Sequence, residues 1–377
     1  MTSRERLLAA LNGKMTDQVP YAPLLTPYYY AALNDPAMND IVSVSRYIGS
    51  DILERHSPCV ETVYHSAEVK SEDVNGVNRT TISNRFGSVV QETLWKDGTT
   101  HSFKRFVKTV EDLKVLTDVY ANIEYRPAYE LFEQEEKRIG DAGIATADGP
   151  MSPLLYLIQH LSTLEETIFL LYDETDAVEE FFNAVHQGNI KYYKLIRDMK
   201  LNCVIPYEDT STTLISRDWM QKYALPALNE YADILRGGPN HFIVHMCGKL
   251  QGFKDDIKTL NCDGFDSLCP PLTGDTCIWT AQESWAGKRL IGGIDPVAWK
   301  YKSPREILEI VKSILLNLKV KTGFILCSGD SVAAGTPLKN MKVIADFLRL
   351  GGQEFLKTEV SEACIDECIE KALMLNN

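Results

Sequence analysis

The sequence lacks the features of a membrane protein or a secreted protein. Its 377 residues contain no uninterrupted apolar run of the roughly 18 residues that a transmembrane helix needs. Segment 1–14 reads as a charged amphipathic helix without the long apolar core of a signal peptide. We therefore expect a cytoplasmic protein with no membrane partner.

The sequence also has fewer basic than acidic residues. Lys and Arg total 39 against 52 Asp and Glu, which gives a net charge of -13 at pH 7. Such an acidic surface disfavours nucleic acids and anionic membranes as partners. The nine cysteines are odd in number and irregularly spaced, so we expect reduced thiols rather than a disulfide framework.

Short apolar strands alternate with longer helical segments along the chain. These strands are apolar throughout, which is typical of parallel strands covered on both faces. No G-x-G-x-x-G motif follows the first of them, so we favour a (β/α)8 TIM barrel over a doubly wound sheet. The eight predicted strands lie at 19–25, 49–54, 143–149, 203–209, 242–247, 264–268, 289–295 and 323–329.

One segment, 57–110, has a different pattern. Its polar and apolar residues alternate around N-G, F-G and D-G pairs, which is typical of β-hairpins. We expect a single α/β barrel domain over 1–377, with a β-hairpin-rich insertion at 57–110. Helical patterns fill the other gaps, and Ser303 followed by Pro304 predicts a capped helix start before the last strand.

Candidate metal ligands lie where predicted strands end. In a TIM barrel the active site lies at the carboxyl ends of the strands. His245 and Cys247 end the fifth strand, and Cys327 ends the eighth. Zinc favours nitrogen and sulfur ligands, and a catalytic zinc takes three protein ligands and keeps one position open. From spacing alone, a zinc site and a buried histidine beside a buried thiol fit equally well.

A zinc site would need ligands beyond the His-x-Cys pair. Cys327 is the candidate third ligand, and Asp330, Cys269 and Glu208 are candidates for a further one. Glu208 and Asp209 end the fourth strand, and two buried carboxylates are costly unless they are paired or bind a ligand. We expect one of the two to be functional, or else to cap the Ser- and Thr-rich loop that follows.

The aromatic run Tyr28, Tyr29 and Tyr30 follows the first predicted strand. Its three rings would line an aromatic-binding pocket, or else belong to a helix or an interface. Spacing does not separate these interpretations.

Several segments together resemble the uroporphyrinogen decarboxylase superfamily, and within it the corrinoid-linked methyltransferases. They are SRERLLAALNGKMTDQVPYAPL, YEDTSTTLISRDWMQKYALP, HMCGKL, PPLTGDT, IGGIDP and FILCSGDSVAAGTPLKN. The resemblance covers nearly the whole chain and implies a (β/α)8 barrel. True decarboxylases in this superfamily carry an M-R-Q-A-G-R type signature whose arginines hold substrate carboxylates. The matching segment here, APLLTPYYYAALND, has no Arg, so we do not expect decarboxylation.

The methyltransferase branch implies a zinc ion held by His-x-Cys and a distant Cys. His245 and Cys247 match the first part. The distant Cys usually lies in an L-x-P-G-C segment, but this chain reads L-C-S-G-D, so Asp330 takes that place and Cys327 lies three residues earlier. Relatives with Asp at this position resemble the O-demethylase type.

The resemblance implies a methyltransferase that moves a methyl group from a small O-methylated donor to the cobalt of a corrinoid. A methoxylated aromatic is the favoured donor, and zinc would activate the leaving oxygen. No D-x-H-x-x-G corrinoid motif occurs, so the corrinoid (cobalamin) is expected on a separate partner protein. The expected metal ligands are His245, Cys247 and Cys327, and the residues expected to orient the substrate or move a proton are Glu208, Asp209 and Asp330.

Other functions stay open at this point. The chain could move a methyl group from a methylated corrinoid protein to a thiol or a pterin. It could be a decarboxylase-like lyase without metal, or a binding protein on a degenerate barrel. A homodimer is one assembly that the sequence allows.

Overall fold

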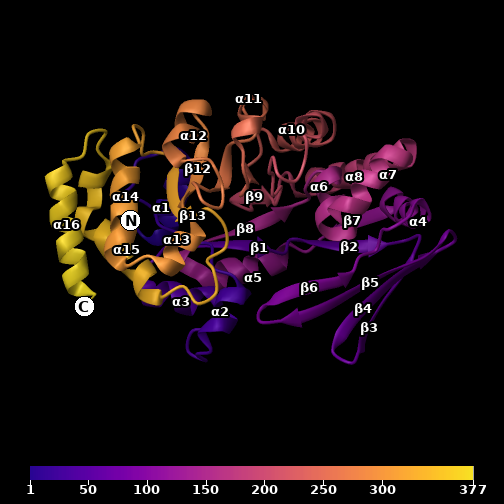
Figure 1. The fold of residues 1–377 in the computed structure, drawn as a ribbon, viewed down its shortest axis with the longest axis horizontal. Helices are drawn as coiled ribbons and strands as arrows, with labels where there is room; N and C mark the ends of the chain where they lie inside the picture. The colour runs from indigo at the N-terminus through magenta and orange to yellow at the C-terminus, as the bar shows by residue number, and fades with distance from the viewer. Residues whose placement is uncertain (377) are drawn as a thin grey trace.

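A curled parallel β-sheet lies at the centre of the computed structural model, which describes residues 1–376 (Figure 1). Within this range the sheet has seven strands that follow one another in chain order, and every neighbouring pair is parallel. The predicted TIM-barrel-like α/β architecture is therefore confirmed. The strands are β1 (Ile52–Ser57), β8 (Gly143–Gly149), β9 (Cys203–Pro206), β10 (His241–His245), β11 (Gly264–Leu268), β12 (Arg289–Ile294) and β13 (Phe324–Ser328).

The first predicted strand, 19–25, is reduced to a single bridge between Tyr21 and Leu326. The amide of Ala22 donates to the carbonyl of Leu326 at 3.0 Å, and the amide of Asp51 donates to the carbonyl of Tyr21 at 2.8 Å. The segment therefore lies between β13 and β1 and closes the sheet. The prediction of a regular strand here is wrong, because two prolines in the segment lack the amide hydrogen that a continuous ladder needs.

Helices surround the sheet. Ser303 caps one of them by accepting from the amide of Glu306, with Pro304 in the first turn, as the sequence predicts. No helix within residues 1–376 is long and apolar enough to cross a lipid bilayer. The helices are α1 (Ser3–Leu11), α2 (Pro27–Leu33), α3 (Ile41–Ile48), α4 (Val110–Ala121), α5 (Tyr129–Ile139), α6 (Pro153–Tyr156), α7 (Leu164–Asp173), α8 (Thr175–Ile196), α9 (Arg217–Trp219), α10 (Leu225–Leu235), α11 (Lys254–Ile257), α12 (Ile278–Ser284), α13 (Pro296–Tyr301), α14 (Pro304–Asn317), α15 (Leu338–Gly351) and α16 (Glu362–Leu375).

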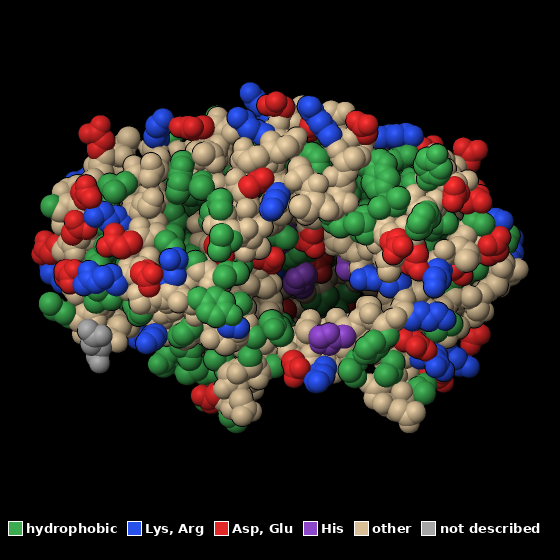
Figure 2. Space-filling model, in the orientation of Figure 1, with side chains coloured by type: hydrophobic (Ala, Val, Ile, Leu, Met, Phe, Trp, Pro, Cys, Tyr) green, Lys and Arg blue, Asp and Glu red, His purple; other side chains and the backbone are tan. Residues whose placement is uncertain are grey.

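Helix α1 closes one end of the barrel. Its side chains Leu7 and Leu11 are fully buried in one apolar cluster with Ile205 and Ile325 from the strands. A second, larger cluster packs the outside of the sheet against the surrounding helices. Because α1 fills the end at which the strands begin, the carboxyl ends of the strands form the accessible mouth. Figure 2 shows a hollow in the middle of the displayed face, in which acidic and histidine side chains gather.

An antiparallel arm projects from the barrel at the lower right of Figure 1. Within the described residues it is a sheet of four strands, and the predicted hairpins are confirmed. The turns at Asn75-Gly76 and Asp97-Gly98 have positive φ at both residues, as tight hairpin turns require. The antiparallel strands are β3 (Glu68–Val74), β4 (Val77–Asn84), β5 (Gly87–Lys96) and β6 (Thr99–Lys104), with a separate pair formed by β2 (Val60–Tyr64) and β7 (Ile123–Pro127).

The turn at Gly98 packs directly on the start of α2. A Cβ atom at Gly98 would lie 2.3 Å from the carbonyl oxygen of Pro27, whereas a Cβ at Gly76 would meet nothing within 4 Å. Both glycines have positive φ, so either alanine variant costs about 1–2 kcal/mol of backbone strain. We expect Gly98→Ala to lower the free energy of unfolding by about 1–3 kcal/mol more than Gly76→Ala, because it also forces the arm off α2. Urea denaturation of both variants measures this difference, and equal losses would contradict the packing.

Candidate metal centre

Three potential metal ligands meet at the barrel mouth. Asp209, His245 and Cys247 each offer an atom, and these atoms all lie within 4.8 Å of one another. The Nε2 atom of His245 lies 3.4 Å from Asp209 Oδ1, and the thiol of Cys247 lies 3.6 Å from the same oxygen. His245 ends β10, and Asp209 follows β9. The group therefore sits at the carboxyl ends of two neighbouring strands.

Backbone packing brings the two loops together. The amide of Glu208 donates to the carbonyl of His245 at 3.0 Å, which extends the pairing of β9 and β10 toward the mouth. A Cβ atom at Gly248 would lie 2.2 Å from the carbonyl oxygen of Thr210. Only a residue without a side chain allows this approach. Gly248 thus permits the contact that places Asp209 beside Cys247.

Asp266 fixes the orientation of the His245 ring. Its Oδ2 atom lies 2.8 Å from Nδ1 of His245, and its Oδ1 atom lies 2.7 Å from Nη2 of Arg55. All three side chains are buried. Because Nδ1 donates its hydrogen to Asp266, the lone pair of a neutral His245 ring is left on Nε2, which faces Asp209. This is the arrangement of a metal-ligating histidine and its supporting carboxylate.

The electrostatics of this trio follow from its burial. Burial alone would raise the pKa of Asp266, but the charge of Arg55 and the hydrogen bond from His245 hold that pKa well below its usual range. Burial acts to lower the pKa of His245, but Asp266 outweighs it and the pKa is raised. The carboxylate is therefore ionised and compensated on both sides.

Strand irregularities accompany the Arg55–Asp266 pair. The pairing of β1 with β8 and the pairing of β11 with β12 both shift register at these residues. The following residues, His56 and Ser267, have φ of 65° and 62°. Bulges re-aim side chains, and positive φ in residues other than glycine is concentrated at functional sites. In this protein the two register shifts and the two positive φ angles lie beside Arg55 and Asp266, whose charged side chains meet inside the barrel.

The structure does not bring Cys327 into the ligand group. Cys327 lies within β13, fully buried in the inner apolar cluster, with its sulfur 3.7 Å from Nη2 of Arg55. Three residues further on, Asp330 is close enough to influence the thiol of Cys247. Burial raises the pKa of Cys247, and the carboxylates of Asp330 and Asp209 raise it further. Asp209, expected to act on the substrate, occupies the place in the group that the sequence assigns to Cys327.

Unlike its neighbour Asp209, Glu208 lies outside the group of potential metal ligands. It is fully buried and accepts hydrogen bonds from the amide of Ser152, at 2.8 Å, and from the hydroxyl of Ser152. Burial raises the pKa of Glu208 to about 7, although these hydrogen bonds oppose the shift. Ser152 also caps α6, so Glu208 fixes the loop after β8. The structure thus separates the two adjacent carboxylates.

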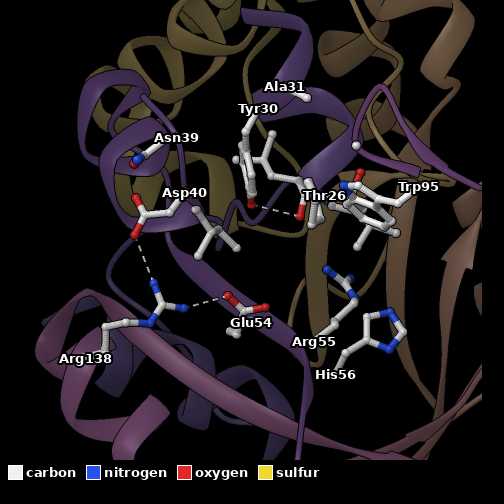
Figure 3. Close-up of a pocket in the computed structure, with 15 residues that line it drawn as sticks. Thr26, Tyr30, Ala31, Asn39, Asp40, Glu54, Arg55, His56, Trp95 and Arg138 are labelled. Carbon is white, nitrogen blue, oxygen red and sulfur yellow. Dashed lines mark hydrogen bonds and ion pairs between the residues drawn. The ribbon is translucent and has the colours of Figure 1, made fainter. Parts of the chain in front are cut away.

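A cavity of about 680 Å³, here called the α2 cavity, lies between α2, β1 and the tip of the arm. Figure 3 shows Arg138 bridging Asp40 and Glu54, with both oxygen atoms 3.1 Å from its guanidinium. Of the tyrosines at 28–30, Tyr30 lines this cavity and Tyr29 is fully buried. All three tyrosines lie within α2, as the helix interpretation expects, and Tyr30 is the one that also lines this cavity.

A second cavity of about 340 Å³ was missed by sequence reasoning. Its walls come from α4, β7, α6, α8 and the end of β9, so no local sequence pattern marks it. The Tyr207 ring stacks on His56 with centroids 4.1 Å apart and lies 4.9 Å from the His245 ring. We call it the tyrosine cavity, and its aromatic lining residues are Tyr120, Tyr125, Tyr156, Tyr192, Tyr207, His56 and His160.

Comparison with known proteins agrees with the family resemblance. A search of curated proteins gives no match. One similar solved structure is a D-psicose 3-epimerase with D-tagatose from Clostridium cellulolyticum H10, at 15% identity and a TM-score of 0.32, covering 66% of this chain and 81% of that one. Residues 81–350 match the family described as uroporphyrinogen decarboxylase (URO-D). This match spans most of the barrel, and the chain therefore belongs to the uroporphyrinogen decarboxylase family.

Proposed function

We propose that this chain is a methyltransferase that moves a methyl group from a small O-methylated donor to the cobalt of a separate corrinoid protein. The observation that carries the proposal is the convergence of Asp209, His245 and Cys247 at the mouth of a barrel of this family. Family membership supports an enzyme of this superfamily in general. Beyond family membership, we propose the O-methylated donor, the corrinoid acceptor and the metal.

The ligand group fits zinc. It offers one nitrogen, one sulfur and one oxygen donor, and three protein ligands leave a coordination position open for a substrate oxygen. Asp266 supplies the supporting hydrogen bond that zinc-binding histidines have. When bound, zinc acts as a Lewis acid that stabilises the negative charge developing on the departing oxygen of the donor.

The protein residues divide the remaining work. His245, Cys247 and Asp209 hold the metal, while Asp266 fixes the ring of His245. Asp330, beside Cys247, orients the donor or delivers a proton to the departing oxygen. Cys327 holds no metal in this scheme, since it packs against Arg55, and Glu208 takes no part in catalysis, since it is bound to Ser152.

Paired arginines disfavour a decarboxylase-like alternative. Arg55 is bound to Asp266, and Arg138 bridges Asp40 and Glu54. These arginines line the α2 cavity, but their charges are already compensated by carboxylates of the protein. They are therefore poor partners for a substrate with several carboxylates. Transfer from a methylated corrinoid to a thiol or a pterin is the alternative that uses the same metal group.

The proposal is tested with reduced corrinoid protein and a panel of methoxylated aromatics, methanol and methylamines. We expect one O-methylated donor to convert cobalt(I) to methylcobalt, followed by absorbance. Removing the metal with a chelator should lower the rate more than about 100-fold, and added zinc should restore it. Transfer from methylcobalamin to a thiol or a pterin, with no cobalt methylation from any donor, would contradict the proposed direction.

A further inference from the structure

The tyrosine cavity shares a wall with the metal centre. Tyr207 lines the cavity, and its ring lies 4.9 Å from that of His245, a ligand in the proposed function. We propose that this cavity binds the methyl donor as an uncharged O-methylated phenol and rejects aromatic carboxylic acids. This inference rests on the proposed function and names its substrate class.

The walls suit one flat aromatic ring. Tyr120 and Tyr156 meet edge to face, with an interplanar angle of 89°, and their hydroxyls lie 2.6 Å apart. Tyr125 and Tyr192 meet at 87° with centroids 5.2 Å apart. Such walls present both ring faces and ring edges to a bound aromatic group. A volume of about 340 Å³ is near the lower limit of small-molecule sites and admits one substituted ring rather than a tetrapyrrole.

The charge of the walls excludes a carboxylate. Within residues 1–376, no lysine or arginine lines this cavity, and its ionisable side chains besides tyrosine are Asp148, His56 and His160. Asp148 Oδ1 lies 2.8 Å from Nδ1 of His56, so this face of the His56 ring is already occupied by a carboxylate of the protein. Burial, together with nearby Arg105, lowers the pKa of His160 and so disfavours its charged form. A ligand carboxylate in this cavity would lose its hydration without gaining a lysine or arginine partner. It would also lie near the carboxylate of Asp148.

The polar groups of the walls suit a phenol. The His56–Asp148 pair is partly exposed, and it lies against the Tyr207 ring that separates the cavity from His245. A phenol hydroxyl can donate to this pair, which leaves a neighbouring methoxy group at the Tyr207 wall, on the side of the metal centre. A few convergent polar groups in an aromatic cavity are the usual means of fixing a ligand's orientation.

The test is isothermal titration calorimetry of the zinc-loaded protein, with no corrinoid protein present. The probes are 2-methoxyphenol and its carboxylated counterpart, 4-hydroxy-3-methoxybenzoate. We expect 2-methoxyphenol to bind at least tenfold more tightly than the carboxylate. Tyr125→Leu should weaken that binding at least tenfold, whereas Tyr129→Leu, on α5 outside the cavity, should leave it within twofold.

A charge-adding variant makes the test sharper. Thr62 is exposed on β2 at the edge of the cavity, and Thr100 is exposed on β6 away from it. Thr62→Arg should raise the affinity for the carboxylate at least tenfold, and Thr100→Arg should leave it unchanged. Carboxylate binding as tight as phenol binding in the native protein overturns the inference, as does the absence of phenol binding. Phenol binding without cobalt methylation supports this inference and instead contradicts the proposed function.

Discussion

Replacing His245 and Cys247 together by alanine is expected to abolish zinc binding and cobalt methylation. The double variant leaves Asp209 as the remaining member of the ligand group, and one carboxylate is too few to retain zinc. Elemental analysis should fall from about one zinc per chain to background. The methylation rate should fall more than about 100-fold, because even residues that only support zinc ligands account for about 10–100-fold.

Cys327→Ala is the informative control for this prediction. Its thiol is buried against Arg55 rather than in the ligand group, so the variant should keep its zinc and lose some stability, about 1 kcal/mol, from the small cavity created. Loss of zinc from Cys327→Ala, at a level like that of the double variant, would return Cys327 to the ligand set. Retention of zinc by the double variant would place the metal elsewhere.

Asp266→Ala is expected to destabilise the fold more than other ion-pair variants. The substitution leaves the guanidinium of Arg55 buried without a counter-charge, which costs about 3–5 kcal/mol. The surface pair Arg305–Glu370 provides the control, because its side chains are about half exposed. Glu370→Ala should cost no more than about 1 kcal/mol. Urea denaturation measures both, and equal costs would contradict the role given to the buried pair.

A second variant separates the packing role of Asp266 from its role toward His245. Arg55→Met combined with Asp266→Leu removes both buried charges and should recover most of the lost stability. It does not restore the hydrogen bond to Nδ1 of His245, so zinc affinity should stay about 10–100-fold below that of the native protein. Native zinc affinity in this double variant would show that Asp266 serves folding alone.

The sequence predicts the barrel because apolar strands and helices alternate with regular spacing. It also predicts that candidate metal ligands lie at the barrel mouth, since the carboxyl ends of strands meet at one edge. It does not predict that Cys327 turns away from that edge. The side chain at 327 lies inside β13 and joins the barrel core, whereas Asp330 lies beyond the strand. Whether a side chain reaches the mouth depends on its position along the strand and on the face of the sheet that it occupies. The sequence spacing between Cys327 and His245 gives neither of these.

Asp266 shows what a closer sequence reading could have found. It is the one charged residue of the buried strand G-F-D-S-L, and a charge buried there needs a compensating partner. The partner, Arg55, lies 211 positions away in the sequence, so its identity depends on the closed barrel. The tyrosine cavity also could not be predicted from the sequence, because its rings come from separate elements that only tertiary packing brings together.

Zinc K-edge X-ray absorption of the purified protein tests the proposed ligand set of Asp209, His245 and Cys247. We expect one sulfur scatterer at about 2.3 Å, from Cys247, with nitrogen and oxygen scatterers at about 2.0–2.2 Å, from His245 and Asp209. The oxygen shell should change when an O-methylated donor is added. Two sulfur scatterers, or a protein that transfers methyl groups without zinc, would contradict this ligand set.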